Sequence, residues 1–166
     1  MQKYKNFENN IITKAYLAGF IDGNGSLYAR IIPVAKSELK FKVSINISFY
    51  QLKKHVYFIK AIQKYYFNKG HLRTRGIMCD LTISDIDSVE MIIKDLIPYL
   101  HIKKPQAKYM LEIIKNVRYI RSKNSSFMEK KATFLEVCIL IDKVANLNNS
   151  KNRVWTYQKV LDEYNK

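Results

Sequence analysis

The segment Tyr16–Gly25, YLAGFIDGNG, decides how this chain folds. Its apolar residues have the spacing of a helix, and two small residues, Ala18 and Gly19, stand side by side within it. A glycine inside a helix costs about 1 kcal/mol relative to alanine, so it is expected where another backbone must come close. The segment then closes on DGNG at positions 22–25, which holds one carboxylate and one carboxamide. This order predicts a tightly packed helix pair whose C-terminal ends present oxygen ligands.

Length and charge predict one basic domain. The 166 residues suit a single domain, 1–166, with a core over about 10–147 and a helical extension over about 148–166. Lys and Arg number 29 against 14 Asp and Glu, which gives a net charge of +15 and a pI near 9.7. Such an excess indicates a polyanionic partner, nucleic acid above all. A basic membrane-surface protein is the alternative, but it usually concentrates its charge in one amphipathic helix, whereas here the charge is spread along the chain. No run of about 18 apolar residues is present, so no membrane span is expected.

The cysteines and histidines indicate no metal centre of the zinc type. Cys79 and Cys138 form no CxxC pair and have no histidine beside them, so we expect both to be reduced and buried. The histidines lack metal-ligand spacing, and no Ser–His–Asp arrangement is suggested.

Helical and strand periods alternate along the chain in the order αββαββα, followed by further helices. The predicted elements are a helix capped by Thr13 and running to about Asp22, strands over 26–32 and 40–50, a helix over 52–67, a hairpin of 71–75 and 79–83 around Gly76, and helices over 87–96 (capped by Asp87), 105–121, 127–147 and 156–164. The fold class is therefore α+β.

Each predicted strand has one apolar and one polar face. The polar face carries Tyr28, Arg30, Lys42, Ser44, Asn46, Ser48, His71, Arg73, Arg75, Asp80 and Thr82. An ordinary solvated sheet face is the simpler interpretation. This face, however, mixes guanidinium, amide, hydroxyl and carboxylate groups, which are the groups that read base edges in the major groove. Lysines elsewhere suit phosphate contacts: Lys53, Lys54, Lys103, Lys104, Lys123 and Lys151.

The motif LAGFIDGNG closely resembles the signature of the LAGLIDADG homing endonucleases. The resemblance extends over roughly residues 10–147, through GFIDGNGS, SFYQLKK, RTRG followed by Asp80, and YLHIKKPQA, to the single-motif subgroup encoded by organelle introns. It implies a homodimer in which the motif helices pair and two four-stranded antiparallel sheets form a saddle over double-stranded DNA. The implied helix interface comprises Leu17, Ala18, Gly19, Phe20 and Asp22.

The resemblance also implies roles at a catalytic centre. Gly23 would offer a backbone carbonyl, and position 24 a side-chain oxygen, to Mg²⁺, for which Ca²⁺ or Mn²⁺ can substitute. Gln51 would orient the attacking water, and Lys103 would stabilise charge on the scissile phosphate. Arg73, Arg75 and Asp80 would fall on the base-reading hairpin, and His55 falls near a position where relatives often place a basic residue.

Several of these roles have simpler alternatives. Lys103 belongs to a Lys-Lys pair on a very basic chain and is a surface lysine on that evidence alone. Gln51 follows a strand and can cap the next helix instead. Asp22 is expected to serve its own helix end or a water network rather than a metal.

One position departs from the family pattern. The metal-binding carboxylate of the family falls on Asn24, which has the same size but no charge. Metal-assisted phosphodiester hydrolysis needs an anionic ligand, so the sequence predicts a form that binds DNA and cleaves it poorly. The parent activity is site-specific cleavage of double-stranded DNA at a long, pseudo-palindromic target. An intron RNA-binding maturase and a pure DNA-binding module remain alternatives.

Composition points to synthesis inside a chloroplast or mitochondrion. Lys, Ile, Asn and Tyr, whose codons are AT-rich, are abundant. The N-terminal MQKYKNFENN has neither an apolar signal core nor the character of a transit peptide.

Overall fold

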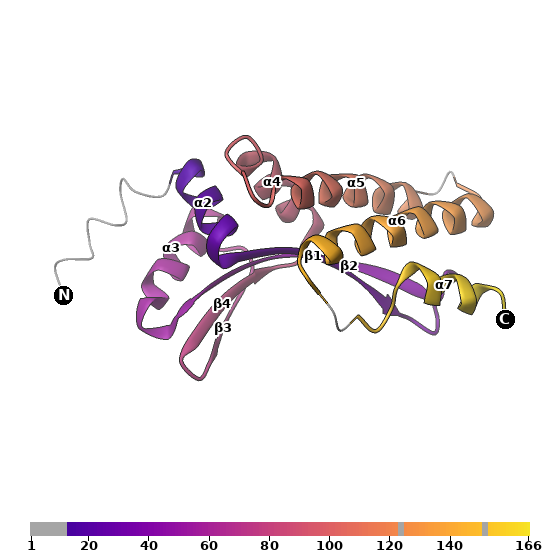
Figure 1. Ribbon diagram of the computed structural model, residues 1–166, viewed down its shortest axis with the longest axis horizontal. Helices are drawn as coiled ribbons and strands as arrows, with labels where there is room; N and C mark the ends of the chain where they lie inside the picture. Colours follow the sequence, from indigo (N-terminus) through magenta and orange to yellow (C-terminus); the bar gives the residue numbers. More distant parts are fainter. Residues whose placement is uncertain (1–12, 123–124, 151–152) are drawn as a thin grey trace. The chain divides into compact units, whose positions relative to one another are not determined.

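The computed structural model describes residues 13–122, 125–150 and 153–166 (Figure 1). Its elements are α2 (Lys14–Asn24), β1 (Gly25–Pro33), β2 (Phe41–Leu52), the 3₁₀ turn η2 (Lys53–His55), α3 (Val56–Tyr65), β3 (His71–Arg75), β4 (Met78–Ile83), α4 (Ile86–Leu96), α5 (Lys104–Arg121), α6 (Phe127–Leu147) and α7 (Tyr157–Tyr164). This order confirms the predicted αββαββα arrangement followed by helices. The N-terminal segment MQKYKNFENN, Lys123 and Lys151 lie outside the described residues.

The strands form one four-stranded antiparallel sheet in the order β1-β2-β4-β3. Strand β2 pairs with β4 from Ile47↔Ile83 to Leu52↔Met78, and β3 pairs with β4 from His71↔Thr82 to Arg75↔Met78. Alternation along each strand sets its two faces, because successive side chains point to opposite sides. The α+β class and the antiparallel sheet are therefore confirmed.

The chain divides into two compact units. Unit 1 comprises the described residues of Met1–Ser26 and Asn46–Lys104, and unit 2 comprises those of Leu27–Ile45 and Pro105–Lys166. Strand β2 therefore contributes its first residues to unit 2 and its remainder to unit 1.

Unit 1 contains α2, α3, α4 and the β3–β4 hairpin around an apolar core. Phe20 of α2 stacks on Phe49 of β2 with ring centroids 6.3 Å apart and meets Phe58 of α3 edge-on at 4.9 Å. Lys14 and Asp95 join α2 to α4 through an ion pair of 2.7 Å. These contacts hold α2 in place within the unit, Lys14 at its first residue and Phe20 in its C-terminal half.

Unit 2 contains β1, the start of β2 and helices α5, α6 and α7. Phe41 contacts the rings of Phe134, Trp155 and Tyr164 at 6.1, 4.7 and 5.9 Å between centroids. The Tyr164 hydroxyl donates to the carbonyl of Leu39 at 2.7 Å. The predicted C-terminal helix is therefore anchored in this unit by aromatic packing.

The two cysteines lie in different units. Cys79 belongs to unit 1 and Cys138 to unit 2, and both are buried, free thiols. Burial, and then the Asp80 carboxylate, raise the pKa of the Cys79 thiol. Burial, with a smaller effect of Asp142, raises the pKa of the Cys138 thiol to about 12. Reduced, buried cysteines are as predicted.

Element boundaries differ from the prediction at three places. The cap of α4 is Asp85, whose carboxylate accepts from the Ser88 amide at 3.0 Å, and not Asp87, which lies in the first turn. The helix predicted from residue 52 begins at Val56, after the η2 turn of Lys53–His55. Helix α2 extends to Asn24 because the Gly25 amide bonds to the Ile21 carbonyl.

No helix in the described part of the chain combines the length and apolar character that crossing a bilayer requires.

Candidate active site and nucleic-acid interface

Helix α2 exposes a stripe of small residues. Ala15, Gly19 and Gly23 recur every fourth residue, and all three are exposed. A Cβ atom built at Gly19 or at Gly23 meets nothing within 4 Å. The chain's own packing therefore does not require glycine at either position, whereas a second backbone approaching this stripe would.

The predicted helix interface needs revision in this light. Leu17 and Ala18 are fully buried within their own chain, so their side chains are not available to a partner. Gly19 is exposed and Phe20 and Asp22 are half-buried. Ala15 was not among the predicted interface residues, although it lies four residues before Gly19 on the same exposed stripe.

The C-terminal end of α2 brings predicted site residues together. Gly23 and Asn24 are exposed there. The Asp22 carboxylate accepts hydrogen bonds from the backbone amides of His101 and Lys103, both at 2.8 Å, and from that of Ile102 at 3.2 Å. The Lys103 ammonium in turn donates to the Asp22 backbone carbonyl at 2.5 Å. Two segments 81 residues apart are thus joined at this helix end.

The ionisation of Asp22 follows from these contacts. Partial burial alone would raise the pKa of Asp22. The hydrogen bonds from the amides of His101, Lys103 and Ile102, together with the charge of the Lys103 ammonium, outweigh burial and lower the pKa. Asp22 is therefore an anion at neutral pH, and its charge is directed at its own chain. The expectation that the Asp22 carboxylate serves its own helix end is therefore wrong: its hydrogen-bond donors are the amides of residues 101–103.

Gln51 lies near the end of β2 and is half-buried. Its side-chain carbonyl accepts from the amide of Leu52 at 2.9 Å. The η2 turn has no side-chain cap, so Gln51 does not cap it, and the water-orienting role of Gln51 stays a prediction.

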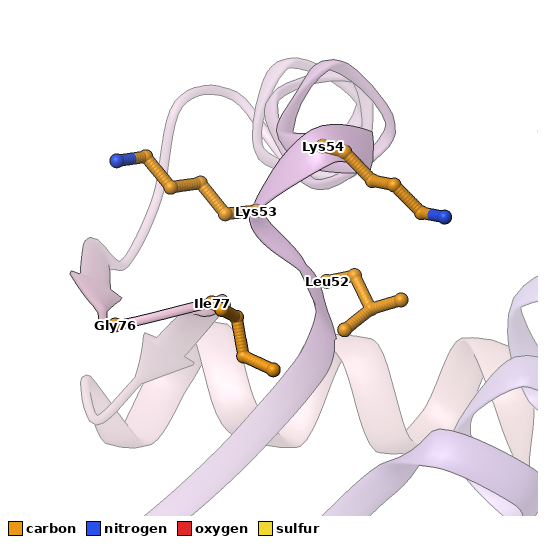
Figure 2. Close-up of a pocket in the computed structure, with 5 residues that line it drawn as sticks. All are labelled: Leu52, Lys53, Lys54, Gly76 and Ile77. Carbon is orange, nitrogen blue, oxygen red and sulfur yellow. The ribbon is translucent and has the colours of Figure 1, made fainter.

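A pocket lies at the end of β2, where Leu52, the residue after Gln51, forms part of its lining (Figure 2). It is lined by Leu52, Lys53, Lys54, Gly76 and Ile77, and the Lys53 amide donates to the Ile77 carbonyl at 2.7 Å across it. Figure 2 shows the Lys53 and Lys54 side chains extending in opposite directions from the segment. An apolar wall flanked by two ammonium groups suits contact with a sugar-phosphate backbone, as predicted for these lysines.

The β3–β4 hairpin carries a network of polar side chains. Arg73 faces Asp80 across the ladder and donates to its Oδ2 from Nε and Nη2 at 3.2 and 2.9 Å. The Arg75 guanidinium lies 3.8 Å from the other carboxylate oxygen. Arg73 and Arg75 are exposed, and the buried Asp80 carboxylate orients both of their guanidinium groups.

Not every residue of the predicted base-reading face is accessible. Asn46, Ser48 and Asp80 are at most 6% exposed. Ser48 shares a hydrogen bond with Thr82 at 2.9 Å, and Asn46 accepts from the Ser84 hydroxyl at 2.7 Å. Buried polar groups must find partners, and neighbouring strands supply them. These three residues therefore support the face, while the exposed groups of unit 1 on it are His71, Arg73 and Arg75.

The other residues predicted to read bases lie in unit 2. Arg30 is exposed and its guanidinium lies 5.1 Å from the centroid of the Tyr28 ring. Lys42 is exposed, and Ser44 is half-buried.

The donors at the α2 end are poorly suited to a divalent cation. Within the described residues, no group of three or more His, Cys, Asp or Glu side chains is arranged to hold a metal. Gly23 and Asn24 offer only neutral oxygens, and the Asp22 carboxylate is occupied by amide donors. Mg²⁺ sites normally include one or two carboxylates. The residues present do not fit tight Mg²⁺ binding.

Comparison with known proteins identifies related sequences and structures. A family model described as LAGLIDADG endonuclease matches residues 17–111. The DNA endonuclease I-CreI from Chlamydomonas reinhardtii is 34% identical over 146 residues, which cover 87% of this chain and 84% of the relative. The DNA endonuclease I-CvuI from Chlorella vulgaris is 31% identical over 149 residues, covering 89% and 87%.

A crystal structure of I-CvuI in complex with its target in the presence of calcium superimposes with a TM-score of 0.79 at 29% identity and covers 90% of each chain. A second structure shows I-CvuI with the I-CreI target in the presence of magnesium, with the DNA not cleaved, at a TM-score of 0.78.

Proposed function

Because the chain belongs to the LAGLIDADG endonuclease family, we propose that it binds one specific double-stranded DNA site and that this form cleaves that site poorly. Site-specific binding and cleavage of DNA is the activity of this family. The observation that carries the loss of cleavage is the neutral side chain of Asn24 at the α2 end, beside an Asp22 carboxylate that is occupied by backbone amides.

DNA binding is supported by the hairpin and by charge. The exposed guanidinium groups of Arg73 and Arg75 are held in place by Asp80, which suits paired hydrogen bonds to guanine. A net charge of +15 provides the phosphate contacts that dominate affinity. I-CvuI is crystallised with DNA, and by relation to it we assign the same partner to this chain.

A second copy of the chain completes the proposed assembly. The stripe of Ala15, Gly19 and Gly23 on α2 is exposed and sterically open, which suits a two-fold helix pair. Two-fold symmetry in the protein implies a long, pseudo-palindromic target with half-sites about one helical turn apart.

A divalent cation is consistent with the crystals of I-CvuI, which were grown in the presence of calcium or of magnesium. When bound, it would cancel charge that develops at the scissile phosphate. We propose Mg²⁺ for an active form, in which Gly23 and a carboxylate at position 24 would hold it. At position 24 the protein as it stands has only a neutral oxygen to offer.

We also propose synthesis inside an organelle. The sources of I-CreI and I-CvuI suggest an organelle origin for this group. The AT-rich codon usage implied by the composition supports the same origin.

The test begins with the unaltered protein. Duplexes are selected by the protein from a randomised DNA library, and the enriched site is assayed for affinity and for cleavage with Mg²⁺. We expect tight, salt-sensitive binding to a pseudo-palindromic duplex and little cutting. Rapid Mg²⁺-dependent cutting would contradict the loss of cleavage. Tighter binding to intron RNA than to the selected duplex would favour a maturase instead.

A further inference from the structure

Three successive backbone amides converge on the Asp22 carboxylate. The Oδ2 atom accepts from His101 and Ile102, and the Oδ1 atom accepts from Lys103. Residues 101–103 form no helix or strand. Ile102 is 70% exposed, so its side chain gives the segment little apolar anchoring. The hydrogen bonds to one carboxylate are therefore what fixes the conformation of residues 101–103.

The same residue also holds the Lys103 side chain. The Asp22 carbonyl that accepts from the Lys103 ammonium lies in the last turn of α2, where backbone carbonyls lack partners within the helix. The negative end of the helix dipole adds an attraction for a cation. Lysine has a long, flexible side chain, so this contact restricts the ammonium to the helix end that carries Gly23 and Asn24.

We propose that Asp22 is a positioning residue: its carboxylate fixes residues 101–103 and thereby places the Lys103 ammonium at the C-terminal end of α2. The inference deepens the proposed function and rests on it, because Lys103 is the group expected to stabilise charge on the scissile phosphate. It assigns to the acidic residue of the motif a task separate from metal binding, since both carboxylate oxygens accept from the protein's own amides.

The first experiment needs no cleavage. Asp22→Asn keeps the size of the side chain and removes its charge. In hydrogen exchange, the amides of residues 101–103 are expected to lose about tenfold or more of their protection, because bonds to a charged acceptor are strong. Acetylation by an amine-reactive reagent, read by mass spectrometry, should become faster at Lys103 and stay unchanged at the exposed neighbour Lys104.

A matched control removes another carboxylate that accepts from a backbone amide. Asp85→Asn should alter exchange around Ser88 at the start of α4 and leave residues 101–103 unchanged. If Asp22→Asn fails to fold, Asp22→Glu retains the charge but displaces it by one methylene, and it should produce the same changes to a lesser degree. Unchanged exchange and acetylation in the folded Asp22 variants would overturn the proposal.

The second experiment measures cleavage in the Asn24→Asp background. Asp22→Asn should slow cleavage of the bound duplex about tenfold to a hundredfold with little change in DNA affinity. The double variant with Lys103→Ala should be no slower than Lys103→Ala alone, because both act through one amine. If the double variant instead showed the full losses in cleavage rate of both single variants combined, positioning through Lys103 would be overturned. If Asn24→Asp itself cleaves nothing, the proposed function fails, while exchange and acetylation still decide whether Asp22 holds the segment.

Discussion

At the scale of single residues, Asn24 differs from aspartate, the ligand proposed for an active form, by one functional group. Asn24→Asp supplies a negative oxygen with no change in volume, so Mg²⁺-dependent cleavage of the selected duplex should appear or rise steeply. Removing one group that stabilises transition-state charge typically costs about a hundred- to a thousandfold, and a dimer of this chain lacks two. Single-turnover cleavage rates measure the gain. Asn24→Ala, which offers no side-chain oxygen, should stay inactive, and equal rates for the unaltered protein and Asn24→Asp would show that position 24 is not the essential ligand.

Arg73 tests whether the hairpin reads bases. Arg73→Lys keeps a positive charge beside Asp80 but loses the planar guanidinium that Asp80 holds in place and that we propose pairs with guanine. We expect discrimination at one or two base pairs to fall by about 1–3 kcal/mol while affinity for random DNA is retained. Lys53→Ala is the matched comparison, because loss of a phosphate contact should weaken all sequences alike and flatten the salt dependence. Competition binding with single-base variants of the target separates the two patterns. Equal losses on target and random DNA for Arg73→Lys would argue against base reading.

The sequence could predict which residues belong to the candidate site, but it could not predict the contacts that those residues make. The motif resemblance indicated Lys103 and position 24, and it placed Arg73 and Asp80 on one hairpin. It did not reveal that Asp22 accepts from residues 101–103, because that contact joins segments far apart in the chain. Nor did it show that Asn46 and Ser48 are buried, since a polar face is read from alternation alone and alternation does not report what covers it.

At the scale of elements, α2 has a glycine that its own unit does not need. Gly19→Ala should raise the free energy of unfolding of the isolated chain by about 0.5–1 kcal/mol, because the added Cβ meets nothing and alanine favours a helix. The same methyl group should weaken dimerisation by holding the paired helices apart, and Gly19→Leu should yield monomers. Sedimentation equilibrium and urea unfolding measure the two effects. Lys108→Ala, at an exposed position of α5, should change neither appreciably. A single-chain mass for the unaltered protein would contradict the helix-pair assignment.

Periodicity predicted the elements well where one residue pattern dominates. The long strand and the helix at 127–147 were expected close to their observed bounds, and Thr13 caps α2 as predicted. The cap of α4 was misassigned to Asp87 because both Asp85 and Asp87 suit an N-cap by residue type. Only the backbone geometry at Asp85, extended before the first helical turn, decides between them.

At the scale of the whole molecule, each compact unit contains one buried thiol. Both thiols have raised pKa values, so they stay protonated near pH 8, where an unfolded cysteine with a pKa of about 8.5 begins to ionise. A buried thiol of this kind contributes fully to the free energy of unfolding below the pKa that the cysteine has in the unfolded chain. This contribution is lost as the pH rises above that value toward the pKa of the folded state. Alkylation of the native protein should therefore be slow at Cys79 and at Cys138.

Because these thiols lie in different units, their alkylation rates can report separately on the opening of each unit. Alkylation at Cys79 records the opening of the unit that carries α2, the hairpin and Lys103, and alkylation at Cys138 records the opening of the unit that carries α6 and α7. If DNA is bound only by the native protein, a bound duplex should lower both alkylation rates. The cysteine whose rate falls more identifies the unit whose opening competes with binding. Peptide-resolved mass spectrometry over time reads both in one sample. Equal rates in every condition would mean that the two units open together, as one cooperative structure.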